Sequence, residues 1–144
     1  MAKRLLWIED DAGPLASLLS EVRKDGWEVK CVYTEEEVHD LLPTDDEWDV
    51  IVLDVILPER ENPSLRDMLS QPYREFVGLD VLDFVNQYYR QAGRQPPPVI
   101  GLTKVSDDRV VTRLLDLGAR EVLVKGSRSP NDVRAAVAKA VGQG

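Results

Sequence analysis

The chain has 144 residues, of which 43% are hydrophobic, and its 18 Lys+Arg against 26 Asp+Glu give a formal charge of -8. This length and apolar content fit one globular domain with its own core, and the acidic balance argues against nonspecific nucleic-acid binding. A single cysteine excludes an internal disulfide, and no long apolar run or charged leader predicts a membrane span or an export signal. We therefore expect a reduced, cytoplasmic protein without a membrane partner.

The first third of the chain alternates strand and helix signals. Residues 5–8 predict a strand that runs into the acids of residues 9–11. Pro14 suits the first turn of the following helix, and Gly26 suits its end. The alternation of residues 27–33 then predicts a second strand.

A capping box marks the next helix, because Thr34 is followed three residues later by Glu37. We expect this helix to extend through Leu42. The unbroken apolar run of residues 50–53 then predicts a strand buried on both faces, and this strand ends in Asp54. Two interpretations of Asp54 are open on this stretch alone. It is either a turn or helix-cap residue, or a ligand-binding residue at the carboxyl end of a central strand.

The remaining segments continue the alternation after a long, irregular connection at residues 59–77. Apolar spacing predicts a helix from about residue 79 to Gly93, and another after Ser106 with Val110, Val111, Leu114 and Leu115 on its buried stripe. The last predicted elements are strands at residues 99–103 and 121–125 and a helix opened by Ser129-Pro130. Five strands alternating with five helices predict an α/β fold, a parallel sheet with helices on both faces.

Ionisable and hydroxyl side chains follow the strands of this sheet, so they are expected to meet at one edge. Neighbouring carboxylates repel each other, and the usual remedies are a raised pKa of one of them or a bound hard cation that takes oxygen ligands. Mg²⁺ fits because it binds one or two carboxylates together with phosphate oxygens. The groups expected at this edge are Glu9-Asp10-Asp11, Tyr33-Thr34, Asp54, Thr103-Lys104 and Lys125.

Four short motifs in this order resemble the receiver domain of bacterial two-component response regulators. They are Ile8-Glu9-Asp10-Asp11, Leu53-Asp54-Val55-Ile56-Leu57-Pro58, Leu102-Thr103, and Gly118-Ala119 with Val124-Lys125. The resemblance covers nearly the whole chain. It implies a single receiver domain over residues 1–144, with a flavodoxin-like (βα)5 fold and the strand order 2-1-3-4-5.

The resemblance also implies a role for each matching residue. Asp54 would be the phosphoacceptor, and Thr103 and Lys125 would contact the phosphoryl group. Mg²⁺ would be held by Asp10, Glu9, Asp54 and the backbone carbonyl of Ile56. The partners implied are a sensor histidine kinase or phosphotransfer protein and an unidentified downstream protein, with homodimerisation left open. Such a protein signals by contact and is not an enzyme in the ordinary sense.

Three single positions depart from the receiver pattern. Lys104 replaces the usual small residue after the switch hydroxyl, Val122 replaces a common aromatic residue, and Gly126 replaces a proline. These departures keep an alternative open, a pseudo-receiver that binds proteins without being phosphorylated. A metabolite phosphatase is disfavoured because no second acid stands two residues after Asp54 to act as a general acid.

The fourth departure is residues 59–77, where receivers have a short loop. One hypothesis makes this insertion a lid or docking element beside Asp54, with Met68, Tyr73 and Phe76 as its apolar contacts. The alternative is a tolerated surface decoration, since loops accept insertions at little cost.

Four further features are expected to be structural. Cys31 lies in the strand alternation and is interpreted as a small core residue. His39 is expected to be solvated in an acidic helix, and Trp48 to pack at the lower edge of the sheet. Residues 45–47 are interpreted as a solvated acidic turn.

Overall fold

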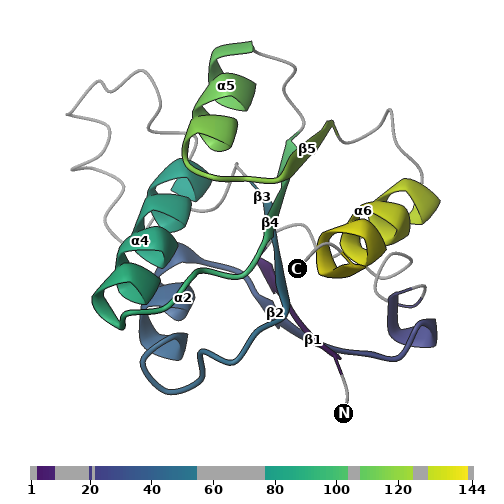
Figure 1. Ribbon diagram of the computed structural model, residues 1–144, viewed down its shortest axis with the longest axis horizontal. Coiled ribbons are helices and arrows are strands. Elements are labelled where there is room, and N and C mark those ends of the chain that lie inside the picture. Colours follow the sequence, from purple (N-terminus) through teal and green to yellow (C-terminus); the bar gives the residue numbers. More distant parts are fainter. Residues whose placement is uncertain are drawn as a thin grey trace.

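The computed structural model describes residues 3–8, 20, 22–54, 77–103, 108–124 and 130–142. Five parallel strands form one sheet in the order β2-β1-β3-β4-β5 (Figure 1). The strands are β1 (Lys3–Ile8), β2 (Trp27–Val32), β3 (Val50–Asp54), β4 (Val99–Thr103) and β5 (Glu121–Val124). The helices are α2 (Glu35–Leu41), α4 (Val77–Gln91), α5 (Asp108–Asp116) and α6 (Pro130–Gly142). The predicted fold class and strand order are confirmed.

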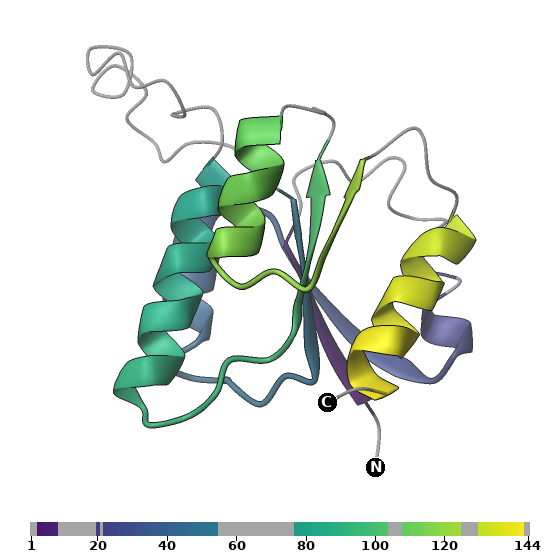
Figure 2. The same cartoon turned by 45° about the horizontal axis from the view of Figure 1, so that its top comes forward.

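The sheet separates two layers of helices. Figure 2 shows α2, α4 and α5 on one side of the sheet and α6 on the other. Each side has its own apolar cluster, one containing Leu6, Ile51 and Leu53 and the other containing Leu5 and Val52. Successive residues of a strand point to opposite faces, so β1 and β3, which are covered on both sides, need unbroken apolar sequences.

Local signals set the helix boundaries. The backbone N–H of Glu37 donates to Oγ1 of Thr34 at 3.2 Å, which confirms Thr34 as the predicted N-cap. The Glu37 side chain reaches back to the backbone N–H of Tyr33, at 3.4 Å, rather than to that of Thr34 as in a standard capping box. Gly118, with φ +100°, follows the end of α5, as expected of a glycine beyond a helix terminus. Helix α4 begins at Val77, so the last residue of the predicted insertion is helical. The rest of that insertion lies outside the described residues, as do its proposed apolar contacts.

The predicted buried stripe of α5 is only partly correct. Leu114 is fully buried, but Leu115 is 47% exposed. Leu114 packs where β4 has Gly101, and a Cβ added at Gly101 would lie 3.2 Å from Cδ1 of Leu114. The helix rotates by about 100° per residue, so with Leu114 directed at this notch its neighbour points away from the sheet.

The predicted solvated turn at residues 45–47 is only partly correct, because Glu47 is exposed but Arg4 of β1 binds the turn. The guanidinium donates to both carboxylate oxygens of Asp45, at 2.9 and 2.7 Å, and to the backbone carbonyl of Glu47 at 2.8 Å. It also lies 4.1 Å from the ring centre of Trp48, which is 7% exposed at this edge as predicted. The hydrogen bonds from Arg4 are the main reason that the pKa of Asp45 is lowered.

Helix α4 and Arg94, three residues beyond its end, bind the same turn from the other side. The Tyr88 hydroxyl donates to the Asp46 carboxylate at 2.8 Å, the Tyr89 hydroxyl donates to the Asp46 carbonyl at 2.7 Å, and Arg94 pairs with that carboxylate at 2.9 Å. The hydrogen bond from Tyr88, followed by that from Arg94, lowers the pKa of Asp46, and burial raises the pKa of Tyr89. We call these residues, with Arg4 and Asp45, the amino-edge network. It joins β1, the α2–β3 connection and α4 at the edge where the strands begin.

In the part of the chain that the structure describes, no helix has the length and apolar character needed to cross a membrane.

Candidate functional site

Asp54 is the last residue of β3, the middle strand of the sheet, and it is 1% exposed. Turn residues normally lie at the surface, so this burial favours the interpretation of Asp54 as a site residue over that of a simple turn former. A carboxylate is expensive to remove from water, and proteins keep such groups mainly where charge is balanced or chemistry needs it. The position is also the carboxyl edge of a parallel sheet, where ligands bind in open α/β folds.

The sheet register places Thr103 beside Asp54. Asp54 pairs with Leu102 of β4, so the next residue of β4, Thr103, lies one step farther along the same edge. Thr103 in turn pairs with Val124, the last residue of β5. The backbones of Asp54 and Thr103 therefore lie next to each other at the carboxyl edge, as predicted.

The other side of β3 is aligned in the same way. Leu53 pairs with Ile8, the last residue of β1, and Ile8 pairs with Val32 at the end of β2. The three strands therefore end at the same level, and Asp54 stands one residue beyond the Leu53–Ile8 pair.

The remaining predicted site residues lie outside the described residues. These are Glu9, Asp10, Ile56 and Lys125, together with the departures Lys104 and Gly126. Thr103 is placed by its backbone alone. Val122 is described, and it is half-buried in β5.

The described donor set is compatible with a hard cation but supplies only part of a site. Asp54 offers carboxylate oxygens, the ligand type that Mg²⁺ prefers. Elsewhere among the residues that the structure places, no group of three His, Cys, Asp or Glu side chains could hold a metal ion. Chemically, Asp54 can act as an oxygen ligand or as an oxygen nucleophile at this edge.

One feature near the carboxyl edge was not predicted. Glu35, in the first turn of α2, is only 6% exposed, although its run of three acids looks like a solvated helix start. Tyr33, one of the groups expected at this edge, is 42% exposed just beyond the end of β2. Cys31 is half-buried in that strand, and burial raises the pKa of its thiol. Nothing in the local sequence distinguishes a buried Glu35 from its exposed neighbours.

Comparison with known proteins supports the resemblance at the level of the fold. No family model matches the chain. The signal receiver domain of a Luxo repressor protein from Vibrio parahaemolyticus is 23% identical, with a TM-score of 0.74 over 99% of this chain and 92% of that one. A CheY-like response regulator receiver domain protein from Methanospirillum hungatei is 18% identical, with a TM-score of 0.72 over 100% of both chains.

A third structure is the BeF3-activated receiver domain of DrrB, a Thermotoga maritima protein, which is 23% identical with a TM-score of 0.71 over 99% of both chains. Many neighbours of this kind are response regulator receiver domains that match nearly the whole length of the chain. The chain therefore has the receiver-domain fold.

Proposed function

We propose that this chain is a phosphoacceptor receiver of a two-component phosphorelay, which takes a phosphoryl group from a sensor histidine kinase onto Asp54. The observation that carries the proposal is Asp54 itself, a carboxylate 1% exposed at the carboxyl end of the middle strand, beside Thr103. The likeness to receiver domains along nearly the full chain supports it.

In the proposed reaction, a carboxylate oxygen of Asp54 attacks the phosphorus of a phosphohistidine in line with the breaking P–N bond. The imidazole leaves and takes up a proton, and the product on this chain is an acyl phosphate. Attack of water on that phosphorus later releases inorganic phosphate and restores the carboxylate. Most of the catalysis in such a transfer comes from positioning and from stabilising charge on the phosphoryl oxygens.

The residues around Asp54 would divide this work. Lys125 would offset charge on the phosphoryl oxygens, and the Thr103 hydroxyl would donate to one of them. Glu9, Asp10, Asp54 and the backbone carbonyl of Ile56 would hold Mg²⁺. When bound, Mg²⁺ supplies positive charge that brings the anionic donor and the carboxylate together.

The added charge would change which protein surfaces the chain binds, so its output is contact with a partner rather than turnover of a substrate. Phosphorylation is therefore a signal, and the partners are a histidine kinase or phosphotransfer protein and a downstream protein. We place this activity in the cytoplasm. We also interpret residues 1–144 as one receiver unit, with residues 59–77 as an insertion.

The test is phosphorylation of the purified protein by acetyl phosphate with Mg²⁺, followed by intact-protein mass spectrometry. We expect one alkali-labile phosphoryl increment, lost in Asp54→Asn and on chelation of Mg²⁺. Asp116→Asn is the matched control, because Asp116 is an exposed acid on α5 and its variant should keep the increment. Absence of the increment from the wild-type protein with acetyl phosphate and with phosphoramidate would contradict the proposal.

Val122 favours a second candidate function, a pseudo-receiver that binds proteins without phosphorylation. Its half-buried aliphatic side chain in β5 stands where the resemblance leads one to expect an aromatic switch residue. A protein that takes up no phosphoryl group from either donor, yet folds normally, would support this alternative.

A further inference from the structure

A row of three rings lies between α2 and α4, two helices that run side by side on one face of the sheet (Figures 1 and 2). The His39 ring of α2 stacks on Phe84 of α4, with centroids 3.9 Å apart and planes inclined by 10°. Tyr88, one helical turn farther along α4, lies 6.4 Å from Phe84. All three side chains are half-buried, so each keeps some exposed surface. The predicted solvation of His39 is therefore only partly correct.

This row is held in place from below. Val38 of α2 and Val81 and Val85 of α4 are buried beneath it, and Phe84 and Tyr88 pack against their cluster. At the far end, the hydrogen bond from Tyr88 to Asp46 ties the row to the amino-edge network. Rings that are already ordered lose little conformational entropy on binding, which is the property of good contact residues at interfaces.

The surface around the row is acidic. Glu36 and Asp40 flank His39 on α2, and Asp80 lies one turn before Phe84 on α4; all three are exposed. Helix α2 contains no lysine or arginine. We call the three rings and these three acids the α2–α4 seam.

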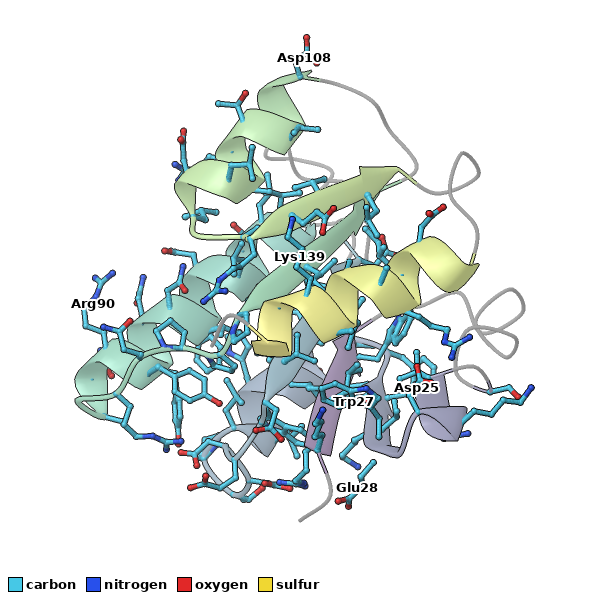
Figure 3. All side chains as sticks on the ribbon, turned by 45° about the vertical axis from the view of Figure 1, so that its right-hand side comes forward. Asp25, Trp27, Glu28, Arg90, Asp108 and Lys139 are labelled. Carbon is cyan, nitrogen blue, oxygen red and sulfur yellow. The ribbon has the colours of Figure 1, made fainter. Side chains whose placement is uncertain are left out.

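The single cation of α4 lies elsewhere. Arg90 lines a cleft on the α5 side of α4, together with Asp83, Asn86 and Asp116. Figure 3 shows its side chain projecting outward near the end of the helix. Within the described residues of α2 and α4, positive charge is therefore absent from the seam itself.

Three cation–π contacts occur among the described residues. Lys3 lies 5.7 Å from the Trp27 ring centre, and the two others come from arginines that also pair with a carboxylate. Arg4 lies over the Trp48 ring while it donates to the Asp45 carboxylate, and Arg94 lies 5.2 Å from the Tyr89 ring centre while it pairs with Asp46. In both cases a planar guanidinium uses an aromatic face and a carboxylate together, a combination for which arginine is better suited than lysine. Among the described residues of α2 and α4, the seam has the same two components without an arginine, and Arg94 approaches its Tyr88 end through Asp46.

We propose that the α2–α4 seam is a docking surface for a partner protein, which it binds through a basic segment that carries arginines. The rings supply the apolar contact and the cation–π surface, and the acids supply charge complementarity and orient the approach. With a net charge of -8, a second copy of this chain, a nucleic acid and an anionic membrane are all poorer occupants. The surface is separate from the buried Asp54, and its use does not depend on the proposed phosphorylation.

The test uses a defined probe, an amidated alanine-based helical peptide with four arginines on one face, and the same peptide with four lysines. His39 is the only histidine of the chain, so its imidazole proton resonances report on the seam alone. We expect these resonances to shift in a saturable manner with the arginine peptide at physiological salt. The lysine peptide should bind several-fold more weakly.

Charge reversal locates the interaction. The seam variant Glu36→Lys/Asp40→Lys/Asp80→Lys should bind the arginine peptide at least about tenfold more weakly, because charges that face each other across an interface are the ones that matter. A matched variant, Asp108→Lys/Asp116→Lys/Glu121→Lys, changes the net charge equally on α5 and β5. Its affinity should fall by no more than about threefold, since screening weakens distant charges. The milder seam set Glu36→Gln/Asp40→Asn/Asp80→Asn serves if the reversal impairs folding.

Three outcomes would overturn the proposal. Equal losses in the seam and matched variants would mean that only net charge attracts the peptide. Unmoved His39 resonances at saturating peptide would place the binding elsewhere. Self-association by sedimentation that the seam variant abolishes would assign the surface to a second copy of this chain.

Discussion

The two edges of the sheet both carry aspartates, but they use them differently. At the amino edge, Asp45 and Asp46 lie in a connection and receive hydrogen bonds from Arg4, Tyr88 and Arg94. At the carboxyl edge, Asp54 ends the middle strand with 1% exposure. The carboxylates of Asp45 and Asp46 bind arginine and tyrosine donors and so connect different elements of the fold. The carboxyl edge, where Asp54 lies, is the edge at which parallel sheets bind ligands. Stability and proposed function are thus assigned to opposite edges.

The largest stability effect that would test this separation is expected from Arg4→Ala. The change removes three hydrogen bonds to the connection and the contact with Trp48, and hydrogen bonds to charged groups are individually strong. We expect the free energy of unfolding to fall by about 2–3 kcal/mol in urea denaturation. Uptake of a phosphoryl group from acetyl phosphate at a temperature where the variant is folded should be unchanged.

Arg4→Lys is the control for this variant. Lysine keeps the positive charge but cannot donate to both carboxylate oxygens of Asp45 at once. The free energy of unfolding of this variant should therefore lie between those of the wild type and Arg4→Ala. If Arg4→Ala is folded but takes up no phosphoryl group, the assignment of stability and proposed function to opposite edges of the sheet is wrong.

A smaller effect is expected from Tyr89→Phe. Tyr89 is 1% exposed, and its hydroxyl donates to the Asp46 carbonyl at 2.7 Å. Removal of the hydroxyl should cost about 1 kcal/mol, because Arg94 also donates to that carbonyl and the ring still packs. Thermal unfolding followed by circular dichroism would measure this. A stability equal to that of the wild type would mean that α4 does not depend on this bond.

The sequence predicted the fold well because the sheet is strongly patterned. Residues 50–54 are unbroken apolar residues ending in an acid, and the structure places them as β3, buried throughout. The N-cap at Thr34 also marks its helix from local residues alone. Asp54 could be found as a site candidate because parallel strands that alternate with helices bring their carboxyl ends together. Of the other predicted site positions, Thr103 has its backbone beside Asp54, and the roles of all of them stay predictions.

The features that were missed depend on contacts between distant segments. Arg4 and Asp45 are 41 residues apart in the sequence, so no periodic pattern announces their pairing, and the acids looked like a solvated turn. Leu115 was expected to be buried because it fits the helical repeat, but the Gly101 notch on the sheet selects Leu114 instead. Both errors concern which partner lies opposite a residue, and this information is tertiary.

The smallest and most gradual of the expected effects is a pH dependence of stability. The folded protein lowers the pKa of Asp45, mainly through the hydrogen bonds from Arg4, and lowers that of Asp46, mainly through Tyr88 and then Arg94. A carboxyl whose pKa is lower in the folded than in the unfolded state binds its proton preferentially when unfolded. Its contribution is therefore fully present above the unfolded value of about 3.9 and is lost as the pH falls through the folded value.

Urea denaturation at a series of pH values from neutral to about 3 should show stability falling at the acid end, in the range where these carboxyls titrate. Asp45→Asn removes one of the groups, so its stability should be lower at neutral pH but should fall less steeply toward acid. Arg4→Ala removes the partner of the same carboxyl, so its free energy of unfolding should also fall less steeply as the pH is lowered. If the free energy of unfolding falls with decreasing pH as steeply in both variants as in the wild type, the Arg4–Asp45 pair contributes equally at every pH. Asp45 would then not stabilise the fold through its lowered pKa, and the proposed difference in role between the acids of the amino edge and Asp54 would be wrong.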